Sequence, residues 1–191
     1  MIREAVSQEA AEIRRVHARA WRVTYPNERY GVTPEWVAQF TESWLTEEAL
    51  ARSTELIAAV LAAPNTFYRV AEVDGHIVGF VHAVEHAPGD AEIPGLYVDP
   101  TVLGAGIGPE LMEAALEWIG AAAARLDVAP YNERAIRFYR RYGFSGVPGS
   151  ERLFNVMPWV DLSGHPDAQD GLALNLNALP IITMARQAQL S

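Results

Sequence analysis

The most constraining feature of this 191-residue chain is a glycine-rich turn between an apolar segment and an amphipathic one. Residues 97–109 read YVDPTVLGAGIGP, with a glycine at every second position from Gly104 to Gly108. Glycine lets backbone N–H groups approach an anion closely, and the N-terminus of a helix adds a favourable dipole. A strand, this turn and a helix, in that order, therefore predict a site for a phosphate or pyrophosphate group.

The segments around the turn predict a mixed α/β chain. Asp74-Gly75 separates two strand-like runs, which predicts a β-hairpin before the turn. A Rossmann-type dinucleotide loop lies near the start of a parallel sheet, so these antiparallel strands exclude it. Pro94-Gly95 interrupts the next strand and predicts a bulge. Hydrophobic spacing and capping residues predict helices over 8–22, from Thr33-Pro34 onward, and over 47–61, 109–123 and 132–142, and strands over 67–73, 76–84, 92–98, 125–129, 151–158 and 179–185.

The composition excludes several kinds of chemistry. The chain has no cysteine, and all 15 of its basic residues are arginine. Thiol nucleophiles, thiolate-bound metals and lysine Schiff bases are therefore excluded. The net charge of −9 argues against nucleic acid as the main partner. No apolar run approaches the roughly 20 residues that span a bilayer, and the first residues do not resemble a signal peptide. We therefore expect a cytoplasmic protein with no membrane partner.

A second informative stretch is residues 132–144, NERAIRFYRRYGF. Ala135, Phe138, Tyr139 and Tyr142 lie at helical spacing and form one apolar stripe, with arginines opposite. Together with the glycine turn, this stretch resembles the GNAT family of N-acetyltransferases. The turn is similar to the family signature Arg/Gln-x-x-Gly-x-Gly/Ala at Gly106 and Gly108. The helix is similar to the signature Asn-x-x-Ala-x-x-Phe-Tyr-x-x-x-Gly-Phe at Asn132, Ala135, Phe138, Tyr139, Gly143 and Phe144.

The resemblance covers residues 2–186 and is strongest over 92–144. It implies an α/β (α+β) fold with a mixed, mostly antiparallel sheet of about six to seven strands, flanked by helices, with a bulge-splayed slot for acyl-CoA. The whole chain, 1–191, would form one domain. Within it the resemblance implies a helical acceptor-side segment over 1–65, an acyl-CoA-binding core over 66–144, and C-terminal strands over 145–191.

The resemblance also implies acetyl-CoA as co-substrate and assigns residues to it. The backbone N–H groups of the turn would bind its pyrophosphate, and the open strand edge would pair with its pantetheine arm. Asn132 would hydrogen-bond the pantetheine, and Tyr139 would protonate the departing thiolate. The turn residues are Leu103, Gly104, Ala105, Gly106, Ile107 and Gly108, and the edge residues are Leu96, Tyr97 and Val98.

Two positions depart from the signature. Leu103 replaces its Arg or Gln, and Pro109 lacks an N–H group where a donor to phosphate is common. Both departures predict weaker pyrophosphate binding. The arginines of the 132–142 helix, at 134, 137, 140 and 141, either offset this loss or form an ordinary solvated helix face.

An ammonium acceptor must lose a proton before it attacks a thioester. Glu92 is the first choice for the base, with an exposed strand-end charge as the alternative interpretation; Glu85, His82 and His86 are weaker candidates. His82 and His86 would lie roughly 13 Å apart on one strand, at about 3.3 Å per residue, so we expect no metal site. His17 is expected on a helix surface.

We therefore expect an enzyme that transfers acetyl from acetyl-CoA to a primary amine in a ternary complex. The acceptor is a small amine or a peptide amine: polyamine, aminoglycoside-like antibiotic, amino acid and protein N-terminus all remain open. One or two aromatic residues around the 25–34 connection are candidates for the wall of an acceptor pocket. The alternative function is a non-catalytic acyl-CoA-binding or regulatory protein. Residues 161–178 form a long loop, interpreted as disordered, as a lid, or as a contact in a homodimer.

Overall fold

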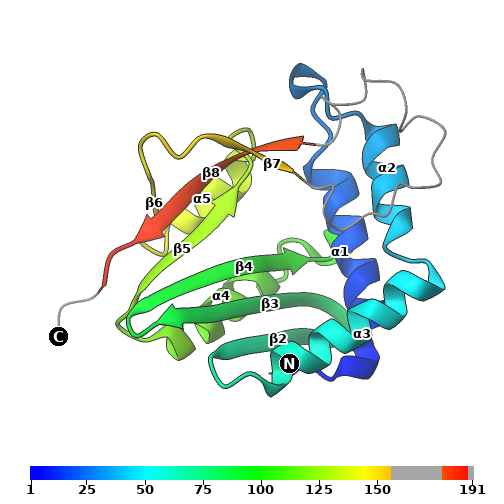
Figure 1. Cartoon of the computed structure of the whole chain (residues 1–191), viewed down its shortest axis with the longest axis horizontal. Helices are drawn as coiled ribbons and strands as arrows, with labels where there is room; N and C mark the ends of the chain where they lie inside the picture. Colours follow the sequence, from blue (N-terminus) through cyan, green and yellow to red (C-terminus); the bar gives the residue numbers. More distant parts are fainter. Residues whose placement is uncertain (156–177, 189–191) are drawn as a thin grey trace.

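The computed structural model describes residues 1–155 and 178–188. Within these ranges eight strands form a mixed sheet in the order β1-β2-β3-β4-β5-β8-β6, and β7 pairs with β8. Among the described strands only β4 and β5 pair in parallel (Figure 1). The predicted mostly antiparallel sheet is therefore confirmed. The bounds are β1 Ile2–Glu4, β2 Thr66–Val73, β3 His76–Ala87, β4 Asp90–Val98, β5 Ala123–Val128, β6 Ser145–Gly146, β7 Arg152–Asn155 and β8 Ala178–Arg186.

The helices begin where the sequence provides capping groups. The side chains of Thr33, Thr46 and Asn132 accept hydrogen bonds from backbone N–H groups at the starts of α2, α3 and α5. The predicted bounds of α4, 109–123, are wrong at both ends. The helix starts at Ile107 and stops before Gly120. The bounds are α1 Ala10–Thr24, α2 Pro34–Ser43, α3 Glu47–Ala62, α4 Ile107–Ile119 and α5 Glu133–Arg140.

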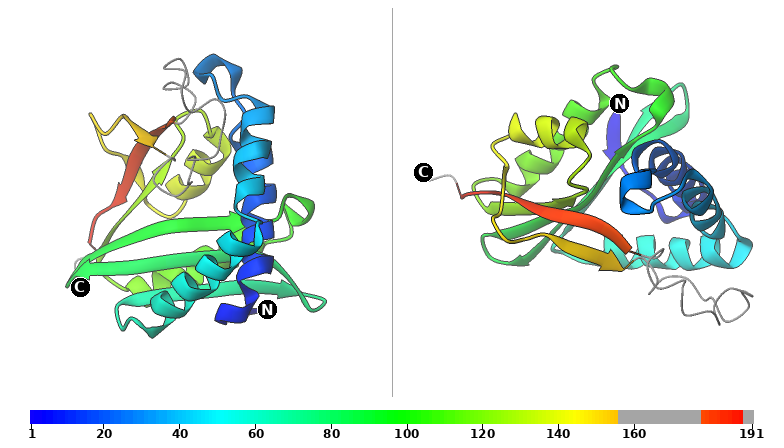
Figure 2. Two further views of the ribbon diagram at one scale, coloured as in Figure 1. Left: turned by 45° about the vertical axis from the view of Figure 1, so that its right-hand side comes forward. Right: turned by 90° about the horizontal axis from the view of Figure 1, so that it is seen from above.

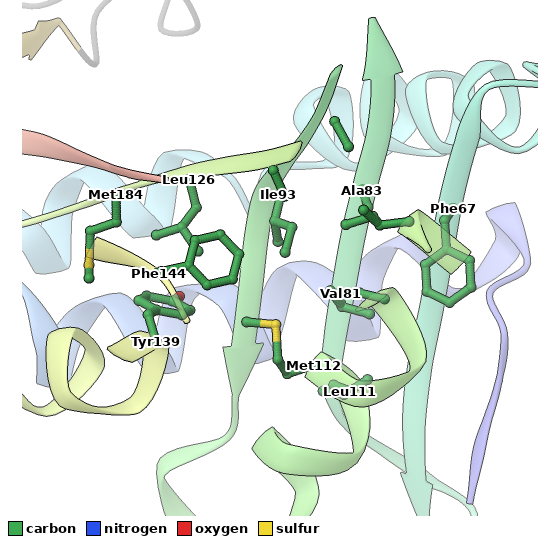
Figure 3. Packing of buried hydrophobic residues seen from close by; sticks show 14 of the residues in the cluster. Phe67, Val81, Ala83, Ile93, Leu111, Met112, Leu126, Tyr139, Phe144 and Met184 are labelled. Atoms are coloured by element: carbon green, nitrogen blue, oxygen red, sulfur yellow. The ribbon is translucent and has the colours of Figure 1, made fainter. Parts of the chain in front are cut away.

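The helices cover both faces of the sheet. α4 packs against β2, β3 and β4 on one face, and α1 and α3 pack on the other, with α2 alongside α1 (Figure 2). The larger apolar cluster lies on the α4 face and reaches from Phe67 on β2 to Met184 on β8 (Figure 3). This one cluster therefore joins the strands that precede the glycine turn to those that follow it.

A bulge in β4 separates this strand from β5. On β3, His82 pairs with Gly95 and Val84 pairs with Glu92, so β4 has one extra residue at this point. The parallel pairing with β5 ends at Glu92 opposite Arg125, and beyond this pair the two strands diverge (Figure 1). The predicted bulge near Pro94-Gly95 is confirmed, and so is the splayed slot, because β4 and β5 do not pair beyond Glu92.

Candidate active site

The opening between β4 and β5 leaves a backbone edge exposed over the last two thirds of β4. Beyond Glu92, β4 pairs with β3 alone, so its other edge has no strand partner in the described part of the chain. The side chains of Leu96 and Val98 pack against the α4-face cluster, whereas Tyr97 packs against the helices of the other face. An extended ligand arm can therefore add to this edge as a further strand would.

The glycine turn follows β4 directly. The buried carboxylate of Asp99 holds its start, accepting hydrogen bonds from the Thr101 backbone N–H at 3.0 Å and from Arg19 Nε at 2.6 Å. Gly104 and Gly106 have φ angles of +92° and +86°, which residues with a side chain rarely adopt. Gly106 is also the residue that precedes the first turn of α4.

Several N–H groups of the turn have no internal acceptor. Ala105 donates to the Val102 carbonyl at 3.2 Å, whereas no partner is found among the described residues for the N–H groups of Gly104, Gly106, Ile107 and Gly108. Free N–H groups at a helix N-terminus suit an anion. Leu103 is exposed and apolar and offers no side-chain contact to phosphate. Of the six N–H groups of residues 103–108 that were predicted to bind pyrophosphate, four are therefore free.

Asn132 and Tyr139 lie at the two ends of α5. Asn132 Oδ1 accepts from the Ala135 backbone N–H at 3.1 Å, which leaves the side-chain amide N–H groups available. Tyr139 is buried beside Phe138 and Phe144, and its hydroxyl has no hydrogen-bond partner within the described residues. Burial raises the pKa of the Tyr139 phenol, and the nearby Tyr97 adds to the shift. Tyr139 therefore keeps its proton at neutral pH.

Glu92 lies at the point where β4 and β5 diverge. Its Oε2 atom is 2.8 Å from Nε2 of His86 and 3.2 Å from Nη2 of Arg125. Its Oε1 atom has no partner in the described ranges. Glu92 alternates along β4 with Ala91 and Ile93, which are buried on the α4 face, so its side chain projects from the opposite face. One carboxylate oxygen is thus held and the other is free.

The other base candidates differ in their surroundings. His82 stacks on Tyr68, and its Nε2 atom is buried without a partner in the described structure. Burial lowers the pKa of His82, and the nearby Glu92 carboxylate opposes that shift in part. Glu85 accepts a hydrogen bond from the Gly89 backbone N–H at 3.0 Å. His86 contacts Glu92 directly and therefore belongs to the Glu92 environment rather than competing with it.

The prediction that His17 lies on a helix surface is wrong. Its ring lies among aromatic side chains of α1, β3, β4 and the residue that follows α2, with ring centroids 4.2 Å from Tyr97 and 4.7 Å from Trp44. Burial lowers the pKa of His17 to about 3, and Arg14 contributes to the shift. The spacing of Ile13, His17 and Trp21, four residues apart, was a signal that this position lies on the buried stripe of α1.

The aromatic residues that precede the sheet mostly pack on one another. Trp21 contacts Tyr25, Phe40 and Trp44, and its Nε1 donates to the Tyr97 hydroxyl at 3.3 Å. The Tyr97 hydroxyl also lies 3.2 Å from that of Tyr25. This cluster, which we call the α1–α2 aromatic cluster, joins the N-terminal helices to the strand that borders the opening.

The arginines of α5 and its last turn divide into two pairs. Arg137 forms an ion pair with Glu133 at 3.0 Å, and Arg141 lies over the Phe138 ring at 5.5 Å. Arg134 and Arg140 are exposed, and their side chains have no ionic partner among the described residues. These two remain available for an anion.

Four residues that belong to no recognisable motif lie around Glu92. Arg125 and Asp127 come from β5, Arg152 from β7 and Thr183 from β8, and with Glu92 and Leu126 they line a cavity of about 150 Å³. No local pattern indicates this, because the pairing of β7 and β8 beside β5 is decided by contacts far apart in the sequence. The predicted loop over 161–178 lies, except for its last residue, outside the described residues.

Two further properties concern the described residues alone. No group of three or more His, Asp or Glu side chains in them lies close enough to hold a metal ion. None of their helices combines the length and apolar character that a bilayer crossing requires.

The sequence and the fold of this chain are similar to those of known acetyltransferases. The model of the acetyltransferase (GNAT) family matches residues 12–144. An uncharacterized N-acetyltransferase of Mycobacterium tuberculosis is 32% identical over 140 residues, which cover 71% of this chain and 83% of the relative. The N-alpha-acetyltransferase RimI of the same organism is 30% identical over 99 residues, covering 50% of this chain and 63% of the relative. The PaiA N-acetyltransferase of Thermoplasma acidophilum, solved with coenzyme A, has the same fold, with a TM-score of 0.67, 19% identity and 98% of each chain covered.

Proposed function

This chain belongs to the GNAT acetyltransferase family and is an acyltransferase, and from that premise we propose that it moves acetyl from acetyl-CoA to a primary amine while both are bound. The observation that carries the proposal is the divergence of β4 and β5 beyond Glu92, directly before a turn with free N–H groups. An open strand edge and an anion-binding turn in succession fit a long thioester whose far end bears phosphates.

The residues present suit acetyl-CoA along the whole length of this path. The free N–H groups of Gly104, Gly106, Ile107 and Gly108 would hold the pyrophosphate, and the β4 edge at Leu96–Val98 would pair with the pantetheine arm. The Asn132 amide would donate to the same arm. Arg134 and Arg140 would bind the remaining phosphate charge, in place of the polar side chain that Leu103 does not provide. Acetyl-CoA supplies the activated acyl group.

Glu92 and Tyr139 would each carry out one of the two proton transfers of the reaction. Oε1 of Glu92 would take the proton from the acceptor ammonium, and the Tyr139 hydroxyl would donate its proton to the departing sulfur. The new N–C bond forms as the C–S bond breaks, so the products are the N-acetylated acceptor and free CoA thiol. Glu92 projects from one face of β4 and Tyr139 packs on the other, so the two groups lie on opposite sides of the opening. That arrangement suits direct transfer, and the absence of cysteine supports it because no thiol can hold the acetyl group.

A panel of amines supplied with acetyl-CoA tests the proposal. We expect release of free thiol that depends on the amine, together with CoA binding measurable by calorimetry. Clear CoA binding with no thiol release from any polyamine, aminoglycoside, amino acid or peptide would favour the alternative, a non-catalytic acyl-CoA-binding protein. The altered turn at Leu103 and Pro109 is the observation that favours this alternative.

A further inference from the structure

A small charged cavity lies at the apex of the opening between β4 and β5. Glu92 and Arg125, which line it, are also the last pair of the parallel ladder before the strands diverge. Residues of β7 and β8 complete the wall, with Thr183 opposite Asp127 in the antiparallel ladder. The carboxylate of Glu92, which would take the proton of the acceptor amine, therefore forms part of the cavity wall.

The charges that line the cavity come in opposite pairs. Arg125 contacts Glu92 at 3.2 Å, and Arg152 contacts Asp127 at 2.6 Å. Two carboxylates and two guanidinium groups give the lining a net charge of zero. A simple alkylammonium ion would gain from the carboxylates but would also meet both guanidinium groups. A molecule with an amine and an anion close together would complement both kinds of group.

Both guanidinium groups retain donors for an anion. Each has five N–H groups, of which Arg125 directs one from Nη1 to Asp90 and one from Nη2 to Glu92. Arg152 is held in place by Asp127, by the Thr183 hydroxyl at 2.8 Å and by the Ser150 carbonyl. A fixed guanidinium with unused donors is suited to bind a carboxylate through two hydrogen bonds.

The size of the cavity limits the group that enters it. Its volume of about 150 Å³ is well below the roughly 300–1,000 Å³ of pockets that enclose a whole drug-sized ligand. The amine, the neighbouring carbon and the carboxylate of an amino acid comprise five non-hydrogen atoms. A head group of that size fits, whereas the rest of the acceptor must extend outside.

We propose that the acceptor is an amine with a carboxylate on the adjacent carbon, as in a free amino acid, and that this cavity binds its head group. The inference rests on the proposed function, since it assigns the acceptor of the same reaction. Glu92 receives the amine, and Arg152 together with Arg125 receives the carboxylate.

A matched series of acceptors tests the proposal. For each of several side chains, the free amino acid, its carboxamide and its decarboxylated amine are supplied with acetyl-CoA, and kcat/KM is measured from thiol release. We expect the acid to exceed the other two by about tenfold or more. The carboxamide contains the more readily deprotonated amine, so a preference for the acid would not arise from amine reactivity. Equal kcat/KM values across the series would overturn the proposal.

A variant of Arg152 provides a second test of the proposal. Arg152→Gln is expected to raise the KM of the amino acid about tenfold, leave the KM of acetyl-CoA unchanged and abolish the preference for the acid over the carboxamide. Arg52→Gln, which removes an exposed arginine paired with Glu48 on α3, is the matched control and should change none of these values. An unchanged acceptor KM in a folded Arg152→Gln protein contradicts the proposal.

Further measurements distinguish a variant that fails to fold, an incorrect acceptor assignment and an incorrect proposed function. If Arg152→Gln does not fold, calorimetric binding of an N-acetylated amino acid and of its carboxamide to the unaltered protein gives the same comparison without a variant; equal affinities contradict the inference. Thiol release with other amines but with no amino acid overturns the inference and leaves the proposed function standing. No thiol release with any amine overturns the proposed function itself.

Discussion

At the scale of single residues, the surrounding fold sets the protonation or the hydrogen bonding of the candidate side chains. Tyr139 keeps its proton because burial disfavours the phenolate. Glu92 has one oxygen held by His86 and Arg125 and one oxygen free. The His17 imidazole, packed against Trp44 and Tyr97, stays neutral. Each of these states comes from surroundings that neighbours in the sequence do not provide.

Replacement of Tyr139 by Phe tests the general acid. The change removes only the hydroxyl, so packing against Phe138 and Phe144 is retained. We expect kcat to fall about 100-fold, within the range for general acids, while the Kd for CoA stays the same. Tyr142→Phe on the same helical stripe is the control and should keep normal turnover. Normal kcat in Tyr139→Phe would remove this residue from the mechanism.

Replacement of His17 by Phe tests the buried neutral imidazole. The pKa of His17 is lowered to about 3 in the folded protein, against about 6.5 when unfolded. The unfolded chain therefore binds the proton first, and stability from this group is lost as pH falls from about 6.5 towards 3, by up to about 1.4 kcal/mol per pH unit. Urea unfolding at pH 7, 6 and 5 should show a smaller loss of stability in His17→Phe. A slope equal to that of His76→Gln, which alters an exposed histidine, would contradict the burial of His17.

At the scale of elements, the glycine turn and the β4 bulge act together. The bulge ends the pairing of β4 with β5, and the turn then directs free N–H groups to the end of the exposed edge. The bulge lies in β4 and the turn connects β4 to α4, and these two elements pack against each other. A thioester arm and its phosphates would therefore contact well-packed secondary structure. The proposed role of the bulge and the turn in binding acetyl-CoA therefore depends on the backbone more than on side chains.

The variant Gly106→Ala tests the backbone of the turn. Gly106 has a φ of +86°, which costs an L-residue roughly 1–2 kcal/mol. Relaxation of this angle would turn the N–H groups of Gly106 and Ile107 away, so we expect the Kd for CoA to rise about tenfold by calorimetry. Gly149→Ala is the matched control, with a φ of +72° and no neighbour near its added Cβ. An equal effect of both variants on CoA binding would rule out a specific role for the turn.

At the scale of the whole molecule, one apolar cluster joins the strands on both sides of the opening. Val81, Ile93, Leu126 and Met184 belong to the same cluster although they come from β3, β4, β5 and β8 (Figure 3). The two halves can therefore diverge at the surface without losing their common core. A single cooperative unfolding transition is expected from this arrangement.

Truncation of Leu111 tests that common core. Leu111 is fully buried on α4, and its side chain lies against Gly79 of β3. Leu111→Ala should lower the free energy of unfolding by about 2–5 kcal/mol in one transition seen by both far-UV and near-UV circular dichroism. Leu153→Ala, at a residue that is 69% exposed, should change the free energy of unfolding by less than about 0.5 kcal/mol. Two separate transitions would show that the halves fold independently.

Features that are encoded by a few adjacent residues were predictable from the amino-acid sequence. The hairpin at Asp74-Gly75, the helix start at Thr33, the bulge near Pro94 and the glycine turn all follow from the conformational limits of a few adjacent residues. The short strands β1 and β6 were missed because two or three residues have no periodicity of their own. The end of α4 was placed too late because the alanines after Gly120 favour a helix as well as a strand edge.

The way in which distant residues meet depends on long-range contacts of the fold. Whether Glu92 is a free strand-end charge or a held carboxylate depended on Arg125 of β5 and His86 of β3. The cavity beside it required Arg152 and Thr183, which the pairing of β7 with β8 brings to β5. Local sequence determines backbone conformation through sterics and capping. Long-range register is set by burial of a shared core, and no window of the sequence contains that information.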